Sequence, residues 1–112
     1  MRLLIDSQTD APCHGDVYLC RLDKVRPAVV LLHGYFGVRS VSGRFHVLPI
    51  TTQDKSTYGR RFALLPNEGG LEHPSWVKLQ QSQDIDQTSL IRRSGALDSK
   101  RLQQLIYAYN NA

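Results

Sequence analysis

The chain has 112 residues, which is enough for one folded domain and too few for two. Its formal net charge is +4 at pH 7, and Arg supplies ten of the fourteen basic residues; this suits contact with phosphate or RNA, although a small soluble domain can also be basic. No apolar run approaches membrane-spanning length or resembles a signal peptide, and Cys13 and Cys20 form neither a metal-ligand motif nor a disulfide scaffold. These features predict a cytoplasmic protein that has no metal, no cofactor and no membrane partner.

The start of the chain is predicted to be an N-terminal extension, residues 1–13, followed by a single domain over residues 14–112. Within that domain, alternating side chains predict a first strand over residues 16–22. A tight connection then leads into a second and more apolar strand over residues 26–33.

Arg26 and Pro27 stand at the start of the second predicted strand. Because proline lacks an amide hydrogen, it fits the first residue of a strand, and this places Arg26 at the mouth of a core strand. A third strand is predicted over residues 44–51, and it ends in the hydroxyl pair Thr51 and Thr52. If the two strands pair, a guanidinium and a threonine hydroxyl meet at one end of a sheet, which suits a phosphate.

The rest of the chain completes a mainly β, α+β domain. Short strands are predicted over residues 62–65 and 75–81, and residues 89–93 form a short apolar-then-basic piece. A C-terminal helix begins at Asp98 or Ser99, either of which can cap it. The apolar stripe of this helix consists of Leu102, Leu105, Ile106 and Tyr109. We therefore expect a small, mostly antiparallel sheet curled against one helix.

Five sequence segments resemble a known family. They are GDVYL at 15–19, RPAVVLL at 26–32, LPITTQDK at 48–55, SWVKLQQ at 75–81 and IDQTSLIRRSGAL at 85–97. Their order and rough spacing resemble the MazF/PemK family of bacterial toxin endoribonucleases over about residues 14–109. The resemblance implies the CcdB/MazF-type toxin fold, an SH3-like barrel, in a homodimer. It also implies a single-stranded RNA substrate and a cognate MazE/PemI-like antitoxin.

The same resemblance implies a metal-independent reaction, in which the 2′-hydroxyl of RNA attacks the adjacent phosphate to give a 2′,3′-cyclic phosphate. The family carries a catalytic arginine where this chain has Arg26, and a hydroxyl that holds the scissile phosphate where it has Thr51. Thr52 is expected to face the other way if the strand continues. The further residues expected to bind RNA are Arg44, Thr52, Lys55, Arg60, Lys78, Gln80 and Gln81.

Two departures from the family pattern leave the mechanism open. One branch of the family uses an arginine and an aspartate as acid and base where this chain has Lys78 and Gln80, and an amide cannot accept a proton as a carboxylate does. Either Arg26 with Thr51 suffices, as in the other branch, or activity is weak. The link over residues 21–25 is also shorter than the family's usual Gly-rich loop, so a more open groove is expected.

Other interpretations also stay open. A CcdB-like toxin poisons DNA gyrase on a similar fold, but its hallmark is an exposed tryptophan at the end of the helix, and the sole tryptophan here is Trp76 in a predicted strand. Gln80 keeps open a non-catalytic member that only binds RNA or a partner protein. His33 and His46, on neighbouring predicted strands, offer an alternative general base.

Overall fold

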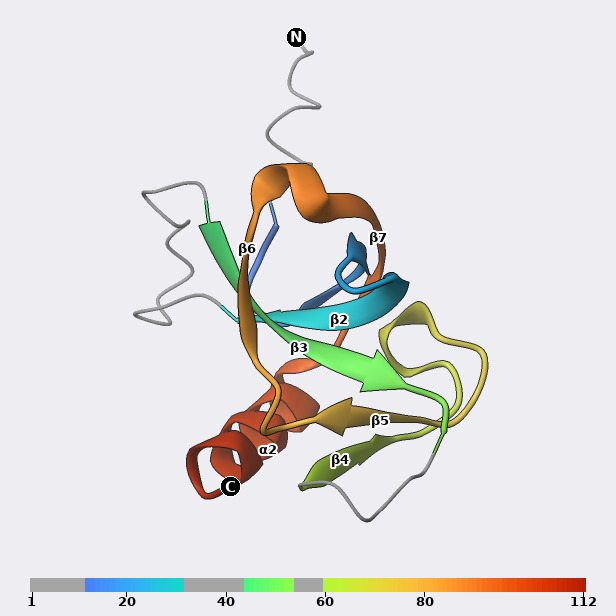
Figure 1. The fold of residues 1–112 in the computed structure, drawn as a ribbon. Coiled ribbons are helices and arrows are strands. Elements are labelled where there is room, and N and C mark those ends of the chain that lie inside the picture. The colour runs from blue at the N-terminus through green and yellow to red at the C-terminus, as the bar shows by residue number, and fades with distance from the viewer. Residues whose placement is uncertain (1–11, 32–43, 54–59) are drawn as a thin grey trace, which may run out of the picture.

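The computed structural model describes residues 12–31, 44–53 and 60–112. Within these ranges a seven-stranded antiparallel sheet lies beside one helix (Figure 1). The elements are β1 (Asp16–Arg21), β2 (Val25–Leu31), β3 (Arg44–Thr51), β4 (Arg61–Leu64), the 3₁₀ turn η1 (Glu68–Gly70), β5 (Ser75–Lys78), β6 (Gln83–Asp86), the 3₁₀ turn η2 (Gln87–Ser89), β7 (Leu90–Ala96) and α2 (Ser99–Asn110). The strand order is β4-β5-β3-β2-β1-β7, and β6 also pairs with β3. The predicted fold class is confirmed, as a sheet that curls without closing.

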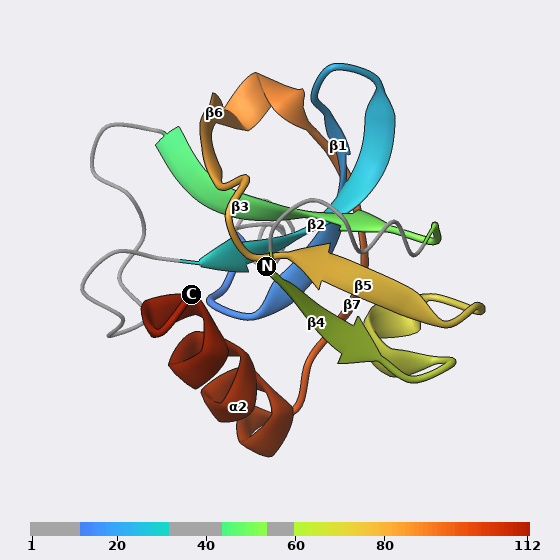
Figure 2. The same cartoon turned by 60° about the horizontal axis from the view of Figure 1, so that its bottom comes forward.

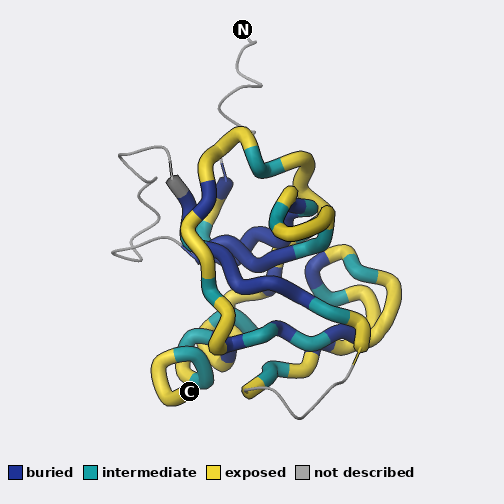
Figure 3. Tube along the Cα trace, viewed as in Figure 1, coloured by how far each residue is buried: buried dark blue, intermediate teal, exposed yellow. Residues whose placement is uncertain are grey.

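Both faces of the central strands are buried. Successive residues of β2 and β3 point to opposite faces and so divide between two apolar clusters. The first cluster, which includes Val29, Leu48 and Leu105, contacts α2 (Figure 2). The second, which includes Ala28 and Val47, lies on the other face of these strands, and Figure 3 shows the central strands in dark blue, as buried. Burial on both faces explains why β2 reads as a continuous apolar run and not as an alternating one.

Two prolines, which lack an amide hydrogen, lie at positions where a strand ladder begins or changes. Pro49 stands where β3 changes its neighbour on one edge, from β6 at Val47 to β5 at Ile50. Pro27 precedes the β2–β3 ladder, which begins at Ala28. Pro27 was predicted to stand at the start of the strand. In the structure it is the third residue of β2, because the hairpin with β1 starts at Val25.

The sequence-based prediction is wrong at three elements. β5 ends at Lys78 and not at residue 81, because the chain turns at 79–80. β6 and β7 were not predicted as strands; β7 is mostly exposed, so it lacks the alternation that reveals a half-buried strand. β3 has the predicted bounds. Residues 32–43, which include His33 and the end of the predicted second strand, lie outside the described ranges.

β7 is held in place by a close backbone contact with η1. A side chain at Gly70 would meet the carbonyl of Ser94, and the φ of Gly70 is +79°, so only glycine suits this position. The Ser94 hydroxyl lies within hydrogen-bond distance of the carbonyl oxygens of Val17, at 3.1 Å, and Gly69, at 3.0 Å. These contacts depend on residues distant in sequence, and local pattern does not reveal them.

The C-terminal helix agrees with its prediction. Asp98 caps α2, and its carboxylate accepts a hydrogen bond from the Arg101 amide at 2.8 Å. Leu105 is fully buried, and the other residues of the apolar stripe pack against the same cluster within this chain. The stripe is therefore part of the subunit's own core.

Arg101 joins the helix to the sheet and to η1. Its Nε donates to Glu68 Oε2 and one Nη donates to the carbonyl of Ala63, each at 2.7 Å. The guanidinium also lies 4.7 Å from the centre of the Phe62 ring. The hydrogen bond from Arg101 lowers the pKa of Glu68 below its ordinary value.

We predict that Arg101→Ala lowers the free energy of unfolding by about 2 kcal/mol, because it leaves the Glu68 carboxylate without its partner. A lowered folded-state pKa stabilises the protein above the unfolded carboxyl pKa of about 4.3, and this contribution disappears as the pH falls through the folded value. Urea titrations at several pH values measure both effects. Lys100→Ala, at an exposed position of the same helix, is the control, and equal losses in the two variants would contradict the role of Arg101.

Candidate active site

An open cleft of about 420 Å³ lies where β2 begins and β3 and β5 end. Within the described ranges its lining includes four basic side chains, two threonines and no carboxylate. The lining residues are Leu19, Lys24, Val25, Arg26, Pro27, Ile50, Thr51, Thr52, Gln53, Arg61 and Lys78. Ile50, a member of the first apolar cluster, is also part of this lining.

Arg26 and Thr51 meet in this cleft, as the sequence predicts. The β2–β3 register pairs Ala28 with Pro49, and continuing it by two residues sets Arg26 opposite Thr51. Both then point to the same face of the sheet, because each lies two residues from the last paired position. A guanidinium and a hydroxyl therefore converge from neighbouring strands.

The Arg26 side chain is largely withdrawn from solvent. It is 16% exposed, whereas its ion-pair partner Asp23, 3.2 Å away in the β1–β2 connection, is 73% exposed. Its Nε atom is buried and has no hydrogen-bond partner among the residues that the structure describes. A desolvated donor without an acceptor is costly, and an anion beside the guanidinium would relieve that cost.

Two further cations face the cleft from neighbouring strands. Arg61 of β4 lies directly opposite Lys78 of β5, and like charges in that arrangement repel. Burial lowers the pKa of Lys78 below its ordinary value, and the charges of Arg26 and Arg61 lower it further. The positive potential that these side chains create is the main electrostatic property of the cleft, and it favours a polyanion.

Thr51 and Thr52 both line the cleft, although opposite faces were expected for them if the strand continued. β3 ends at Thr51 and the chain bends at once, so the alternation of a strand does not extend to Thr52. The amide of Gln53 donates to the Thr51 Oγ at 3.1 Å. The Thr51 hydroxyl hydrogen therefore remains able to donate to an anion.

The other predicted RNA-binding residues lie in several different places. Lys78 lines the cleft, whereas Lys55 lies outside the described ranges. Arg44 begins β3, about 23 Å along the strand from Thr51 at ~3.3 Å per residue. Three others are not among the lining residues, although they lie close in sequence to Arg61 or Lys78, namely Arg60, Gln80 and Gln81.

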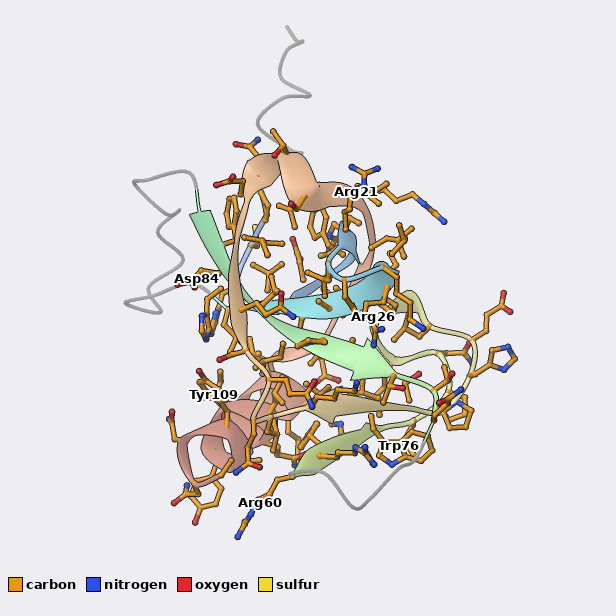
Figure 4. The ribbon with its side chains drawn as sticks, viewed as in Figure 1. Arg21, Arg26, Arg60, Trp76, Asp84 and Tyr109 are labelled. Atoms are coloured by element: carbon orange, nitrogen blue, oxygen red, sulfur yellow. The ribbon has the colours of Figure 1, made fainter. Side chains whose placement is uncertain are left out.

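Gln80 has a structural contact of its own. Its side-chain oxygen accepts a hydrogen bond from the Arg60 amide at 3.3 Å, next to a backbone bond from Leu79 to the Arg60 carbonyl. Because β5 ends at Lys78, Gln80 does not continue the face that Trp76 and Lys78 share. Figure 4 shows Arg60 at the foot of the molecule, away from Arg26.

His46 lies away from the cleft, in a separate polar cluster. Its Nδ1 is 2.8 Å from Asp84 Oδ1 and its Nε2 is 2.8 Å from the Tyr109 hydroxyl, so it ties β6 and α2 to β3. His33 is not described. In the described ranges no three His, Cys, Asp or Glu residues gather as metal ligands, and no helix there has the length and apolar character needed to span a membrane.

Residues 14–109 match the model of a protein family described as the PemK-like, MazF-like toxin of type II toxin-antitoxin systems. The chain belongs to this toxin family. The match covers every strand and nearly all of α2, and with them the whole cleft. The PemK/MazF resemblance in the sequence is thus confirmed.

Solved structures agree with this membership. The toxin MazF-mt6 of Mycobacterium tuberculosis is 27% identical, with a TM-score of 0.67, over 86% of this chain and 93% of that one. A structure titled endoribonuclease from a mycobacterial species is 18% identical, with a TM-score of 0.70, over 90% of this chain and 89% of that one, and it supports the fold alone. A comparison with curated proteins gives no match.

Asp23, Gln53 and Arg61 were not predicted as site residues, although all three lie in or beside the cleft. Arg61 becomes part of the cleft through its register with Lys78. Nothing in the sequence sets that register, because the residues between β4 and β5 contain a 3₁₀ turn and an extended loop. By contrast, the sequence did indicate that the apolar strand β3 ends in polar residues.

We predict that Lys78→Gln raises the free energy of unfolding of this PemK/MazF toxin by a few tenths to about 1 kcal/mol at low salt, because it removes a like-charge pair while keeping most of the side-chain stem. Urea titrations with and without added salt measure the effect, which should shrink as salt screens the charges. Lys100→Gln on α2 is the matched control. A Lys78→Gln protein less stable than the control would contradict the repulsion.

Proposed function

We propose that the chain is the toxin of a type II toxin-antitoxin system and that it cleaves single-stranded RNA without a metal ion. The observation that carries this proposal is the meeting of Arg26 and Thr51 in a cationic cleft, in a chain that belongs to the PemK/MazF toxin family. The cleft is open and lies on the surface, so it can admit a chain passing through it. The likeness to the toxin MazF-mt6, at 27% identity, supports the toxin part of this proposal.

In the proposed reaction, the 2′-hydroxyl oxygen forms a bond to the adjacent phosphorus while the bond from phosphorus to the 5′-oxygen breaks. The 2′-hydroxyl loses its proton, and the departing 5′-oxygen gains one, so a 2′,3′-cyclic phosphate and a 5′-hydroxyl end result. Negative charge grows on the phosphate oxygens in the transition state. Arg26 stabilises that charge and the Thr51 hydroxyl donates a hydrogen bond to it, which is catalysis by preorganised electrostatics.

The proposal includes two protein partners. Membership of a type II toxin family implies an antitoxin. We also propose a homodimer, whose interface lies outside the apolar stripe of α2 because that stripe is buried in the subunit. Gyrase poisoning is disfavoured, since α2 contains no tryptophan and Trp76 lies on β5.

We expect Arg26→Gln to lower the rate of RNA cleavage about 100-fold or more, because the substitution removes the cation that faces the transition state. The assay follows cleavage of a single-stranded RNA pool in EDTA, with product ends identified as cyclic phosphate and 5′-hydroxyl. Arg21→Gln, an exposed position on β1, is the control and should keep full activity. Equal rates for wild type and a folded Arg26→Gln protein, or a strict need for a divalent metal, would refute the mechanism.

We expect Thr51→Val to slow cleavage about 10- to 100-fold, the loss typical of one hydrogen bond to a charged transition state. Thr52→Val should be milder, because Thr52 lies beyond the strand and is exposed. Both substitutions keep the shape of the side chain, and the comparison needs kcat and KM for each. A larger kcat loss in Thr52→Val would move the phosphate contact to Thr52.

A further inference from the structure

The sole tryptophan of the chain stands in one cross-strand row with the proposed catalytic residues. Trp76 of β5 lies directly opposite Thr51 of β3 on one side and Ala63 of β4 on the other. Thr51 in turn lies beside Arg26. The row therefore runs from Arg26 through Thr51 and Trp76 to Ala63, across four strands of the sheet.

This row belongs to the solvent side of β4 and β5. Residues of opposite parity, such as Val77 and Leu64, are buried in the cluster under α2, whereas Trp76 is half-buried and Ala63 is exposed. Cross-strand neighbours on one face lie about 5 Å apart. Both cross-strand neighbours of Trp76, Thr51 and Ala63, are short side chains, so the indole is the largest group of its row.

Cations flank the indole at the spacing of strand residues. Lys78 lies two residues along β5 on the same face, about 6.6 Å away, and Arg61 faces Lys78 from β4. A nucleotide presents the same combination of a flat base and an anionic phosphate a short distance from it. An aromatic ring beside a positively charged groove is the arrangement by which proteins hold single-stranded nucleic acid.

We propose that Trp76 stacks a nucleobase next to the scissile phosphate, so that Thr51, Trp76 and Lys78 hold one nucleotide and its phosphates. This inference rests on the proposed RNA-cleaving function and adds a base-binding site to it. Thr51 and Lys78, the neighbours of Trp76 across and along the strands, both line the cleft, whereas Trp76 is not among the lining residues. Figure 4 shows Trp76 and Arg26 on the same side of the molecule.

The test uses the whole protein and an RNA oligonucleotide carrying 2′-O-methyl groups throughout, which cannot undergo the cleavage. Because Trp76 is the sole tryptophan, its emission reports on the site directly, and binding should quench it. With affinities measured by the fluorescence anisotropy of a dye-labelled oligonucleotide, because these variants lack tryptophan, Trp76→Leu should weaken binding about 10-fold, within the range for one stacked base, while Trp76→Phe keeps most of the affinity. Tyr107→Leu, an aromatic residue 73% exposed on α2, is the matched control and should bind as wild type does.

A second arm removes the base in place of the ring. An otherwise identical oligonucleotide is made abasic at one position at a time. One such position should cost the wild type about 10-fold in affinity and cost Trp76→Leu almost nothing, because the two changes remove the same contact. Circular dichroism and thermal unfolding confirm that each variant is folded.

The outcomes separate this proposal from the function on which it rests. The nuclease function stands if the wild type cleaves RNA and Arg26→Gln does not. Stacking on Trp76 is refuted if tryptophan emission is unchanged on binding. It is also refuted if every abasic position lowers the affinity of wild type and Trp76→Leu equally. If no RNA is cleaved, the proposed function fails. Quenching of the wild-type emission by the methylated oligonucleotide, together with weaker binding by Trp76→Leu, would still support the base-binding site.

Discussion

Strand β3 is the element on which both the core and the cleft depend. One of its edges pairs with β2 along its middle, while the other pairs first with β6 and then, beyond Pro49, with β5. A strand that changes its neighbour cannot keep a flat sheet around it, so the strands diverge at the end of β3. That divergence leaves the polar ends of β2 and β3 exposed to an open cleft, while the residues before Pro49 are buried on both faces.

The same arrangement explains how the protein can concentrate positive charge. Arg26, Arg61 and Lys78 come from different strands, so backbone pairing brings their side chains to the same cleft, and Asp23 also pairs with Arg26. Their mutual repulsion is a local cost that the apolar clusters behind them can offset, because each buried side chain contributes on the order of 2 kcal/mol. A site that is unfavourable when empty binds its anion in a prepared geometry.

The sequence predicted those parts of the fold that carry their own local pattern. The apolar β2, the hydroxyl end of β3 and the capped helix α2 were readable, and with them the meeting of Arg26 and Thr51. Tertiary contacts decided the rest. β7 is held by the approach of Gly70 to Ser94, Thr52 enters the cleft because the chain bends at the end of β3, and Gln80 leaves the face of Lys78 because β5 stops. None of these has a signal within a few residues.

The placement of Gln80 bears on how a cleft of this kind can act on RNA. The family resemblance implies that one branch has a carboxylate at this position, whereas here the side-chain oxygen of Gln80 accepts a hydrogen bond from the Arg60 amide. The described lining of the cleft contains hydroxyl, amide, guanidinium and ammonium groups. Such a set stabilises charge that develops on phosphate far better than it removes a proton from a hydroxyl, since each group can donate hydrogen bonds and most are cations. For the proposed reaction, this set favours the mechanism in which Arg26 and Thr51 stabilise the charge that develops on the phosphate and Lys78 adds to that stabilisation.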